Sequence, residues 1–479
     1  MKLQKYRWLI MVLLSLILAT AIVACGGGDE GEEGADEGDT SGDTSGDEGD
    51  TSGDEGDTAG DTGDEAMELT LKFVICCAPE DAVTYNEIFD AWREAEPQYA
   101  NVQVDLDVTP FAELFPKIET SVASGADFDL FQADGPDIKH YSYNEVIISL
   151  DEYFTQEEKD AFLPQTIEEG SYLGTFMSPA IMQSCSLMFY NSDMTDAAGV
   201  QPPQELRGWT IQEAWDAWEA TQTDEDGDGT PEVWGVRWGQ GTWTGDYEQG
   251  IIRRSAGEVG SPTYEGVGPD GITFTGYLDT PEAISGYQAY RDMHFGDRAV
   301  TPIESIPDIF FTKQSAFVIH PDDAIGTINR LYPDGDFNYG VTGIPYMEGG
   351  AELCHTGSWH YGVSPNSEHQ DVAAALVKFI TGPIGAKIWY DNVRQLPARF
   401  DLLNELPEYN EYPQELFAQG LQEIGVPRIQ TPCYTEYQQI AAVLLQDLQS
   451  AEDLDVAARV EQAAQDMDNA CAKYSGWNE

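Results

Sequence analysis

The sequence predicts an α/β fold made of two packed bodies. Apolar strand patterns alternate with amphipathic helix patterns from residue 69 to residue 132, as in a sheet covered by helices. The stretch Pro179–Tyr190 is apolar at both ends but carries Gln183-Ser184-Cys185-Ser186 in its middle. Further α/β patterns lie on both sides of this stretch, so we interpret it as a strand that crosses between two bodies. The alternative is a core strand whose polar groups are hydrogen-bonded.

Length and charge limit the possible functions. The chain has 479 residues, enough for two or three domains, and 41% of them are hydrophobic. Its formal net charge is −63, and 17 of the 86 acidic residues lie in residues 26–66, which leaves 69 acidic and 20 basic residues in 67–479. A body this negative repels nucleic acid and anionic membranes, so we expect no nucleic-acid partner.

The first 25 residues have the pattern of an export signal. Three basic residues, Lys2, Lys5 and Arg7, precede an apolar run that ends at Ala24. The last residues of this segment, Ile22-Val23-Ala24-Cys25, resemble a bacterial lipobox, after which the cysteine is lipidated. We therefore expect residues 1–25 to be a lipoprotein signal peptide and Cys25 to anchor the protein to the outer face of the cell membrane. An uncleaved helical anchor is the alternative.

Residues 26–66 repeat Gly, Asp, Ser, Thr and Glu with almost no apolar residue. Such a segment has no core to bury and its charges repel each other, which predicts a disordered acidic linker. A linker of this kind would hold an ordered body away from a membrane.

The ordered part begins near Met67 and alternates strands with helices. Strands are expected at 69–75, 102–108 and 129–132, and helices at 85–92, after a capping-box spacing at Thr84–Glu87, and at 111–122, before Gly125. Ligands of such sheets lie beyond the carboxyl ends of the strands, which puts Cys76–Pro79 and Asp134–Pro136 near any site.

The rest of the chain carries a second set of elements. Thr210 and Glu213 have capping-box spacing at the start of a helix. Strands are expected at 313–319, ending in His320-Pro321-Asp322, and at 340–345. Helices fill most of 369–390 and 434–471.

The segment Asp224–Glu232 matches the first half of a calcium loop. Candidate ligands are Asp224, Asp226, Asp228, the Thr230 carbonyl and Glu232, and Gly229 allows the sharp turn. Gly235 occupies the position where an EF-hand has a bidentate Glu. Two interpretations of this segment are open: it binds a structural Ca²⁺, or it is a solvated acidic turn.

The segment from Trp234 to Trp243 is rich in Trp and Gly. Rings held on loops with one face open suit a sugar-binding wall, so Trp238 and Trp243 are candidate ligand contacts. Rings folded back onto the core are the alternative.

Six cysteines remain besides Cys25, and they allow 15 disulfide pairings. Export permits disulfides. Cys433 and Cys471 flank the last helical pair and are the favoured couple. Cys76 and Cys77 are adjacent, so we do not expect them to bond each other. For any one cysteine, a buried reduced state is the alternative.

Several stretches together resemble the extracellular solute-binding proteins of ABC importers, of the maltose-binding type. They occur in the family's order across residues 67–479. They are Ser124–Phe131, Ser149–Tyr153, Leu187–Asn191 with Ala198–Pro203, Ala316–Asp322, Gly357–Trp359 and Leu396–Arg399. Phe128, Cys76-Cys77 and His320-Pro321-Asp322 depart from the family's usual residues, which affects the ligand rather than the fold.

The resemblance implies a two-lobed periplasmic-binding-protein-like fold of type II, with a ligand cleft between the lobes, after a disordered tether. Lobe 1 would hold residues 67–182 and 317–378, and lobe 2 residues 183–316 and 379–479. Strands near 180–186 and 314–319 would cross between the lobes, with a third crossing near Lys378. Hinge closure around the ligand would present the protein to a membrane permease.

The resemblance also points to site residues. Trp359 would stack on the ligand, with Gly357 and Ser358 beside it and Trp238 and Trp243 on the other lobe. Asp134, Gln183, Asp322 and Arg394 are candidate polar partners. The implied protein is a monomeric sugar-binding lipoprotein that requires no cofactor and is not an enzyme.

Two other functions remain open from the sequence. An exported carbohydrate-active enzyme needs paired carboxylates, and 69 acidic residues in the body neither favour nor exclude such a pair. A calcium-dependent surface adhesin or scaffold is supported by the linker and the acidic loop alone.

Overall fold

The computed structural model describes residues 68–77, 79–125, 128–239 and 245–478. The chain divides into two units, Met1–Gly63 and Asp64–Glu479, and every described residue lies in the second. The expected signal peptide, the linker, Cys25 and Trp243 lie outside the described residues.

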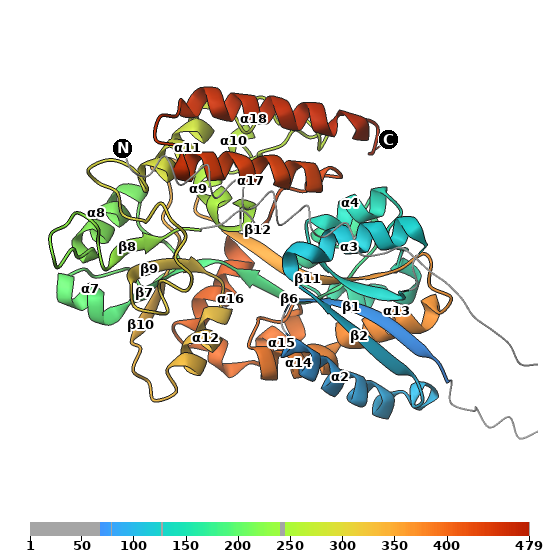
Figure 1. Ribbon diagram of the computed structural model, residues 1–479. Coiled ribbons are helices and arrows are strands. Elements are labelled where there is room, and N and C mark those ends of the chain that lie inside the picture. The colour runs from blue at the N-terminus through green and yellow to red at the C-terminus, as the bar shows by residue number, and fades with distance from the viewer. Residues whose placement is uncertain (1–67, 78, 126–127, 240–244, 479) are drawn as a thin grey trace, which may run out of the picture. The chain divides into compact units, whose positions relative to one another are not determined.

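The second unit contains a six-stranded mixed sheet (Figure 1). Five strands follow the order β12-β11-β3-β1-β2, and β6 also pairs with β11. The bounds are β1 (Thr70–Cys76), β2 (Gln103–Thr109), β3 (Leu130–Asp134), β6 (Ala180–Cys185), β11 (Cys354–Val363) and β12 (Gly425–Pro427). β1 is parallel to β2 and β3, whereas β11 is antiparallel to β3 and β6.

Helices cover both faces of this sheet because β1 buries apolar side chains on both faces. Leu71, Phe73 and Ile75 pack in one core, and Val74 and Cys76 pack in another. Helices with residues in the first core are α2 (Asp81–Ala95), α13 (Gln370–Ile380) and α14 (Pro383–Val393). Helices with residues in the second core are α3 (Phe111–Ser124) and α4 (Asp137–Tyr143).

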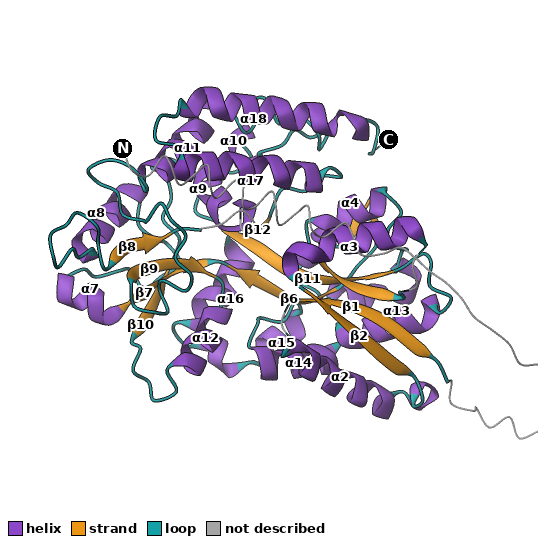
Figure 2. Cartoon of the chain, in the orientation of Figure 1, coloured by secondary structure: helices purple, strands orange, loops and turns teal. Residues whose placement is uncertain are grey.

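A second sheet of four strands has the order β10-β7-β9-β8 (Figure 2). The bounds are β7 (Leu187–Asn191), β8 (Trp234–Arg237), β9 (Ser315–His320) and β10 (Tyr339–Thr342). Helices that share a core with one face are α8 (Ile211–Thr221), α9 (Gly250–Ser255), α11 (Pro281–Asp292), α17 (Tyr434–Ser450) and α18 (Val456–Cys471). Helices on the other face are α12 (Asp323–Leu331), α15 (Phe400–Glu405) and α16 (Gln414–Glu423).

Short elements connect these layers. They are α5 (Gln156–Asp160), α6 (Pro164–Glu169), α7 (Ser192–Ala198), α10 (Pro262–Glu265), the two-stranded β4 (Ser171–Tyr172) and β5 (Thr175–Phe176), and a π-helical turn at Gly245–Gln249.

The chain passes between the two sheets where the polar patch predicted a crossing. β6 belongs to the first sheet and β7 to the second, with Ser186 between them. All six residues of β6 are buried, so the polar groups are also packed, as the alternative held. The chain returns between β10 and β11, and it leaves the first sheet after β12 for α17.

Two expected crossings are wrong in position. Lys378 lies on helix α13, which shares a core with the first sheet. The chain passes to the second sheet only beyond α14, through α15 and α16, and again after β12. β9 does not cross, because both of its neighbours, β7 and β8, belong to the second sheet. The lobe boundaries stay a prediction, but strand pairing groups residues 317–342 with the second sheet rather than the first.

Local signals predicted most element ends well. Thr210 caps α8 with the expected capping box, and Gly125 caps α3 with a φ of +70°. The capping box at Thr84 is wrong: α2 begins at Asp81, so Thr84 lies inside its first turn and its side chain is buried.

Three disulfides occur among the described residues. Cys433–Cys471 confirms the favoured couple, and Cys185–Cys354 joins the end of β6 to the start of β11. Cys76 and Cys77 are bonded to each other, contrary to expectation. Cys77 has a φ of +123°, a backbone conformation that L residues rarely adopt.

Taken alone, no helix among the described residues has both the length and the hydropathy of a membrane span. Only α13 and α14 taken together reach them, with a bend of 56° between the two helices.

The long-range disulfides should differ in their effect on stability. Cys185–Cys354 and Cys433–Cys471 close loops with sequence separations of 169 and 38. Chain entropy then predicts that Cys185→Ala/Cys354→Ala lowers the free energy of unfolding by about 5 kcal/mol and Cys433→Ala/Cys471→Ala by about 4 kcal/mol. Urea denaturation of the full chain measures both.

Cys76→Ala/Cys77→Ala is the matched control, since its bond joins neighbours and restricts the unfolded chain little. An unchanged urea midpoint in both long-range variants would contradict the prediction.

Candidate functional site

A cavity of about 290 Å³ lies at the carboxyl ends of β2 and β3 and is lined from both sheets. Its volume is near the lower end of the range for small-molecule sites, roughly 300–1,000 Å³. The first sheet and its loops contribute Phe111, Asp134, Met182, Ser184, Gly357, Ser358 and Trp359. The second contributes His320, Pro321, Asp322 and Asp323, the π-helical turn Tyr247 and Glu248, and the connecting segments Gln395 and Arg428.

Strand β11 presents the aromatic side of the cavity. Trp359 pairs with Asp134 across β11 and β3, and the β6 register shifts between Trp359 and His360. Such an irregularity re-aims side chains along a strand. The ring of Phe111 stands edge-on to Trp359, with centroids 6.1 Å apart. Trp359 is only partly buried, so it combines a fixed position with an accessible surface.

Tyr247 lies close to the backbone of β11. Its hydroxyl and the Ser184 hydroxyl are 2.6 Å apart. A Cβ at Gly357 would come within 2.9 Å of the Tyr247 ring, so a larger residue there would displace the ring. Gly357 therefore allows a close approach between the two halves of the site.

A buried ion pair forms one wall. Arg428 donates to both carboxylate oxygens of Asp134, with 2.8 Å from Nη1 to Oδ2. The two side chains are 7% and 9% exposed. The guanidinium also lies 5.3 Å from the centroid of the Tyr247 ring. Burial, together with the charge of Asp134, raises the pKa of the neighbouring Asp137 well above its ordinary value.

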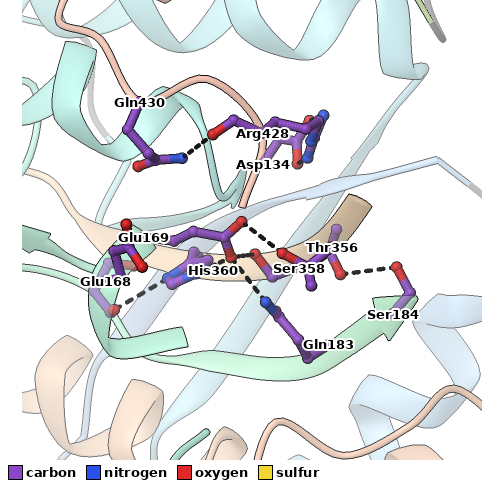
Figure 3. Close-up of polar contacts among 12 residues, drawn as sticks. Asp134, Glu168, Glu169, Gln183, Ser184, Thr356, Ser358, His360, Arg428 and Gln430 are labelled. Carbon is purple, nitrogen blue, oxygen red and sulfur yellow. Dashed lines mark hydrogen bonds and ion pairs between the residues drawn. The ribbon is translucent and has the colours of Figure 1, made fainter. Parts of the chain in front are cut away.

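A polar cluster around Glu169 supports β11 from behind the cavity (Figure 3). Glu169 is fully buried and accepts hydrogen bonds from Ser358 Oγ at 2.7 Å and Gln183 Nε2 at 3.1 Å. Its carboxylate is 3.7 Å from His360 Nε2. Burial alone would raise the pKa of Glu169, but His360 and the Ser358 hydroxyl hold it below its ordinary value. The cluster fixes the hydroxyl of Ser358.

Two adjacent carboxylates form the opposite wall. Asp323 Oδ1 lies 3.1 Å from His320 Nδ1. Asp322 is 1% exposed, and its Oδ2 accepts a hydrogen bond from the Leu396 amide at 3.0 Å. Its Oδ1 has no hydrogen-bond partner among the described residues. Burial and the repulsion of Asp323 raise the pKa of Asp322 to about 8.

The cavity brings together five of the predicted ligand contacts. These are Trp359, Gly357, Ser358, Asp134 and Asp322. Their contact with a ligand stays a prediction.

Three other predicted residues lie elsewhere. Gln183 is fully buried against Glu169 and does not line the cavity. Trp238 is fully buried, donates to the Glu248 carbonyl at 3.0 Å and packs edge-on against Trp218, so the core alternative holds for this ring. Arg394 is half exposed, stacks on Tyr390 and pairs with Glu408 at 3.7 Å. Its neighbour Gln395 lines the cavity instead.

Several lining residues were not predicted. Ser184 belongs to the polar patch that indicated a crossing, and Asp323 follows Asp322, so both had a local signal. Arg428 had none, because its partner Asp134 is 294 residues away. Tyr247 likewise gave no local pattern.

The acidic loop lies apart from the lining of the cavity, between α8 and β8. Carboxylate oxygens of Asp224, Asp226 and Glu232 come within 4.8 Å of one another, and all three residues are exposed. Asp228 and Thr230 are outside this group. The Asp228 carboxylate instead accepts a hydrogen bond from the Thr230 amide at 2.8 Å. The loop thus gathers three of the five predicted calcium ligands.

Solved structures with this fold come from several bacteria. A solute-binding protein of an ABC transporter from Thermotoga lettingae, bound with alpha-D-tagatose, has a TM-score of 0.71 at 18% identity, covering 84% of this chain and 99% of that one. A substrate-binding protein from Listeria monocytogenes in complex with cycloalternan has a TM-score of 0.67 at 19% identity, covering 86% of this chain and 100% of that one. The maltose/maltodextrin-binding domain from Bdellovibrio bacteriovorus bound to maltotriose has a TM-score of 0.68 at 17% identity, covering 84% of this chain and 99% of that one.

The sequence itself matches one family over residues 78–387, well over half of the chain. This region includes both sheets except β1 and β12, and most of the residues that line the cavity. The chain belongs to the family of bacterial extracellular solute-binding proteins and is therefore an extracytoplasmic protein.

Proposed function

We propose that this protein captures a carbohydrate in the cavity between its two sheets and delivers it unchanged to an ABC permease. One observation carries the proposal: a partly exposed Trp359 ring shares one cavity with hydroxyl, carboxylate and guanidinium groups. Flat aromatic surface suits the C–H faces of a sugar, and the polar groups suit its hydroxyls. The sugars bound by the structurally similar proteins support this ligand class.

The contributions to sugar binding differ among the lining groups. Trp359 supplies stacking area, and Ser358 and Ser184 supply hydroxyls held by Glu169 and Tyr247. Asp134 and Arg428 are already paired with each other, so they would meet the sugar as fixed hydrogen-bonding groups rather than as separate charges. The cavity's volume favours one or two sugar rings over a long chain.

Delivery to a permease also sets the expected context of the protein. We propose a monomer tethered through lipidated Cys25, with the acidic segment 26–66 as the spacer. The permease would then receive the ligand from a body that stays beside the membrane. The protein is expected to bind its sugar without turnover, and product analysis after prolonged incubation tests that point.

We also propose that the acidic loop binds calcium as a structural ion. Asp224, Asp226 and Glu232 are held close together although like charges repel, and Ca²⁺ prefers such oxygen ligands. The ion would stabilise the connection from α8 to β8 rather than contact the sugar.

Trp359→Ala should weaken sugar binding by at least about tenfold, because a central aromatic residue often contributes more than 2 kcal/mol to binding. Calorimetric titration with the best sugar from a thermal-shift screen measures the change. The sugar affinity of Trp359→Phe should lie between those of the wild type and Trp359→Ala, since a smaller ring remains.

The matched control is Trp477→Ala, which removes another partly buried Trp that stacks on Tyr172 outside the cavity. It should leave the sugar dissociation constant within about threefold, below a difference of 0.7 kcal/mol. Equal losses in both alanine variants would show that Trp359 acts only through stability.

Calcium should raise the melting temperature of chelator-treated protein. At 100 times the dissociation constant the stabilisation is about 2.7 kcal/mol, enough for a measurable shift. Asp226→Asn should abolish the shift, whereas Asp193→Asn, which removes an exposed carboxylate paired with Asn338, should not. No shift in the wild type would favour the solvated turn.

Growth of an expressing bacterium with a labelled fatty acid should label the protein through Cys25, and Cys25→Ala should abolish the label. Label that persists in Cys25→Ala, or a wild-type protein without label, would contradict the lipid anchor.

A further inference from the structure

Three side chains that follow β3 hold the segment 428–432, which comes directly after β12. They are Asp134, Lys139 and His140, and their partners in the segment are Arg428, the Gln430 side chain and the Pro432 carbonyl. The two contacts from α4 measure 2.8 Å from Lys139 Nζ and 2.7 Å from His140 Nδ1. Gln430 also donates to the Arg428 carbonyl at 3.1 Å (Figure 3). Because Arg428 lines the cavity, its place in the cavity wall depends on how α4 holds this segment.

Both ring nitrogens of His140 face groups that can only accept a hydrogen bond. Nδ1 lies 2.7 Å from the Pro432 carbonyl oxygen, and Nε2 lies 3.1 Å from the Glu119 carboxylate on α3. A neutral histidine carries one ring N–H, whereas an imidazolium carries two. Asn144 Nδ2 is 3.4 Å from each ring nitrogen, but it donates to the His140 carbonyl at 2.9 Å. The two contacts of the ring are therefore both satisfied only by the imidazolium.

We infer that His140 is a positioning residue for sugar binding, whose imidazolium holds the segment 428–432 and thereby Arg428 in the cavity wall. This inference rests on the proposed function and adds a regulation of the same site by pH. When His140 loses a proton, the remaining N–H should stay with Glu119, because a hydrogen bond to a carboxylate is stronger than one to a carbonyl. Nδ1 then presents a lone pair to the Pro432 oxygen. Two acceptors repel each other, so the segment has to shift.

The surroundings of His140 favour its charged form. Burial alone would lower the pKa of His140, but the hydrogen bonds to Glu119 and the Pro432 carbonyl and the charge of Asp137 raise it above its ordinary value. The hydrogen bond from His140 in turn lowers the pKa of Glu119. The other titratable or charged groups near the ring are Lys139 and Tyr141 of α4, Glu436 of α17, Lys473 and Tyr474 after α18, and the Asp134–Arg428 pair beyond Asp137.

The direction of this pKa shift sets the direction of the pH effect. A histidine whose pKa is raised in the folded protein keeps its contacts below its ordinary pKa of about 6.5 and loses them as the pH rises through the raised value. Sugar affinity should therefore fall as the pH rises over that range. Of the three side chains that hold the segment, only His140 has an ordinary pKa near neutrality.

The first test is calorimetric titration of the full chain with D-tagatose, glucose, maltose and maltotriose at pH 6.0 and pH 9.0. His140→Gln carries no titratable group at this position. At pH 6.0 the variant should bind at least about fivefold more weakly than the wild type, the lower end of the usual coupling between two sites. At pH 9.0, where the wild type has also lost the imidazolium, the two affinities should agree within about twofold. His320 and Asp322 of the cavity also titrate, but both proteins contain them.

The second test needs no sugar. The chain has six histidines, and the histidine NMR signal that is missing from His140→Gln identifies His140. This signal should titrate above a pH of about 6.5, and Glu119→Gln should lower its pKa. Hydrogen-exchange protection of the segment 428–432 should fall through the same pKa in the wild type but not in His140→Gln. A sugar that binds should raise the pKa, since coupling between two equilibria is reciprocal.

His369→Gln is the matched control. His369 precedes α13 and lies outside the cavity and away from the segment 428–432. This variant should keep the wild-type affinity at both pH values and the wild-type dependence of segment protection on pH.

The outcomes separate this inference from the proposed function. If His140→Gln weakens sugar binding equally at both pH values, or not at all, the inference is wrong and sugar binding stands. A His140 signal that titrates below a pH of about 6.5 also overturns the inference. If none of the four sugars binds, the proposed function is the part that fails for them, and hydrogen exchange decides the role of His140. Protection that falls through the pKa of His140 then supports its positioning role, and constant protection overturns it.

Discussion

The site depends on one strand, β11, whose position is fixed by backbone hydrogen bonds to three others. It pairs with β12 through residues 354–356, with β6 through residues 356–360 and with β3 through residues 359–363. Because all these pairs share one strand, the placement of Trp359 follows from the first sheet as a whole. The second sheet then needs only to bring Tyr247 and the segment His320–Asp323 to the far side of the cavity.

The cavity contrasts with the acidic surface of the protein. In a body with 69 acidic and 20 basic residues, a buried carboxylate cannot rely on a chance cation nearby. Asp134 and Glu248 have dedicated arginines, and Glu169 is stabilised by hydroxyl, amide and imidazole groups. These partners offset the cost of burying charge, which is several kcal/mol for an unpaired ion. Asp322 is stabilised differently: burial and the charge of Asp323 raise its pKa to about 8, which favours the neutral carboxyl group.

The parts of the fold that sequence analysis predicted are those with local signals. Gly125 and the Thr210 capping box act within a few residues of the helix ends that they specify, and alternating apolar residues predicted β2. Lining residues of the cavity were predicted where they follow the family's order, as at Trp359, or the carboxyl end of a strand, as at Asp134. Arg428 was missed because its role depends on a partner at the end of β3. Trp238 was misassigned because a Gly-rich neighbourhood does not reveal that Trp218 and the Glu248 carbonyl enclose the ring.

The connections between the sheets limit how the two halves can move. Cys185–Cys354 joins β6 to β11 where the chain leaves and re-enters the first sheet, so these two strands cannot separate there. The last connection, which follows β12, carries Arg428 and is tied to β3 through Asp134. Separating that buried pair would leave two uncompensated charges, a cost of about 3–5 kcal/mol. A rearrangement that keeps the pair intact therefore has to turn about the disulfide and the ion pair. Ser186 and residues 343–353 lie directly beyond the disulfide, so their backbone can turn while the disulfide stays in place.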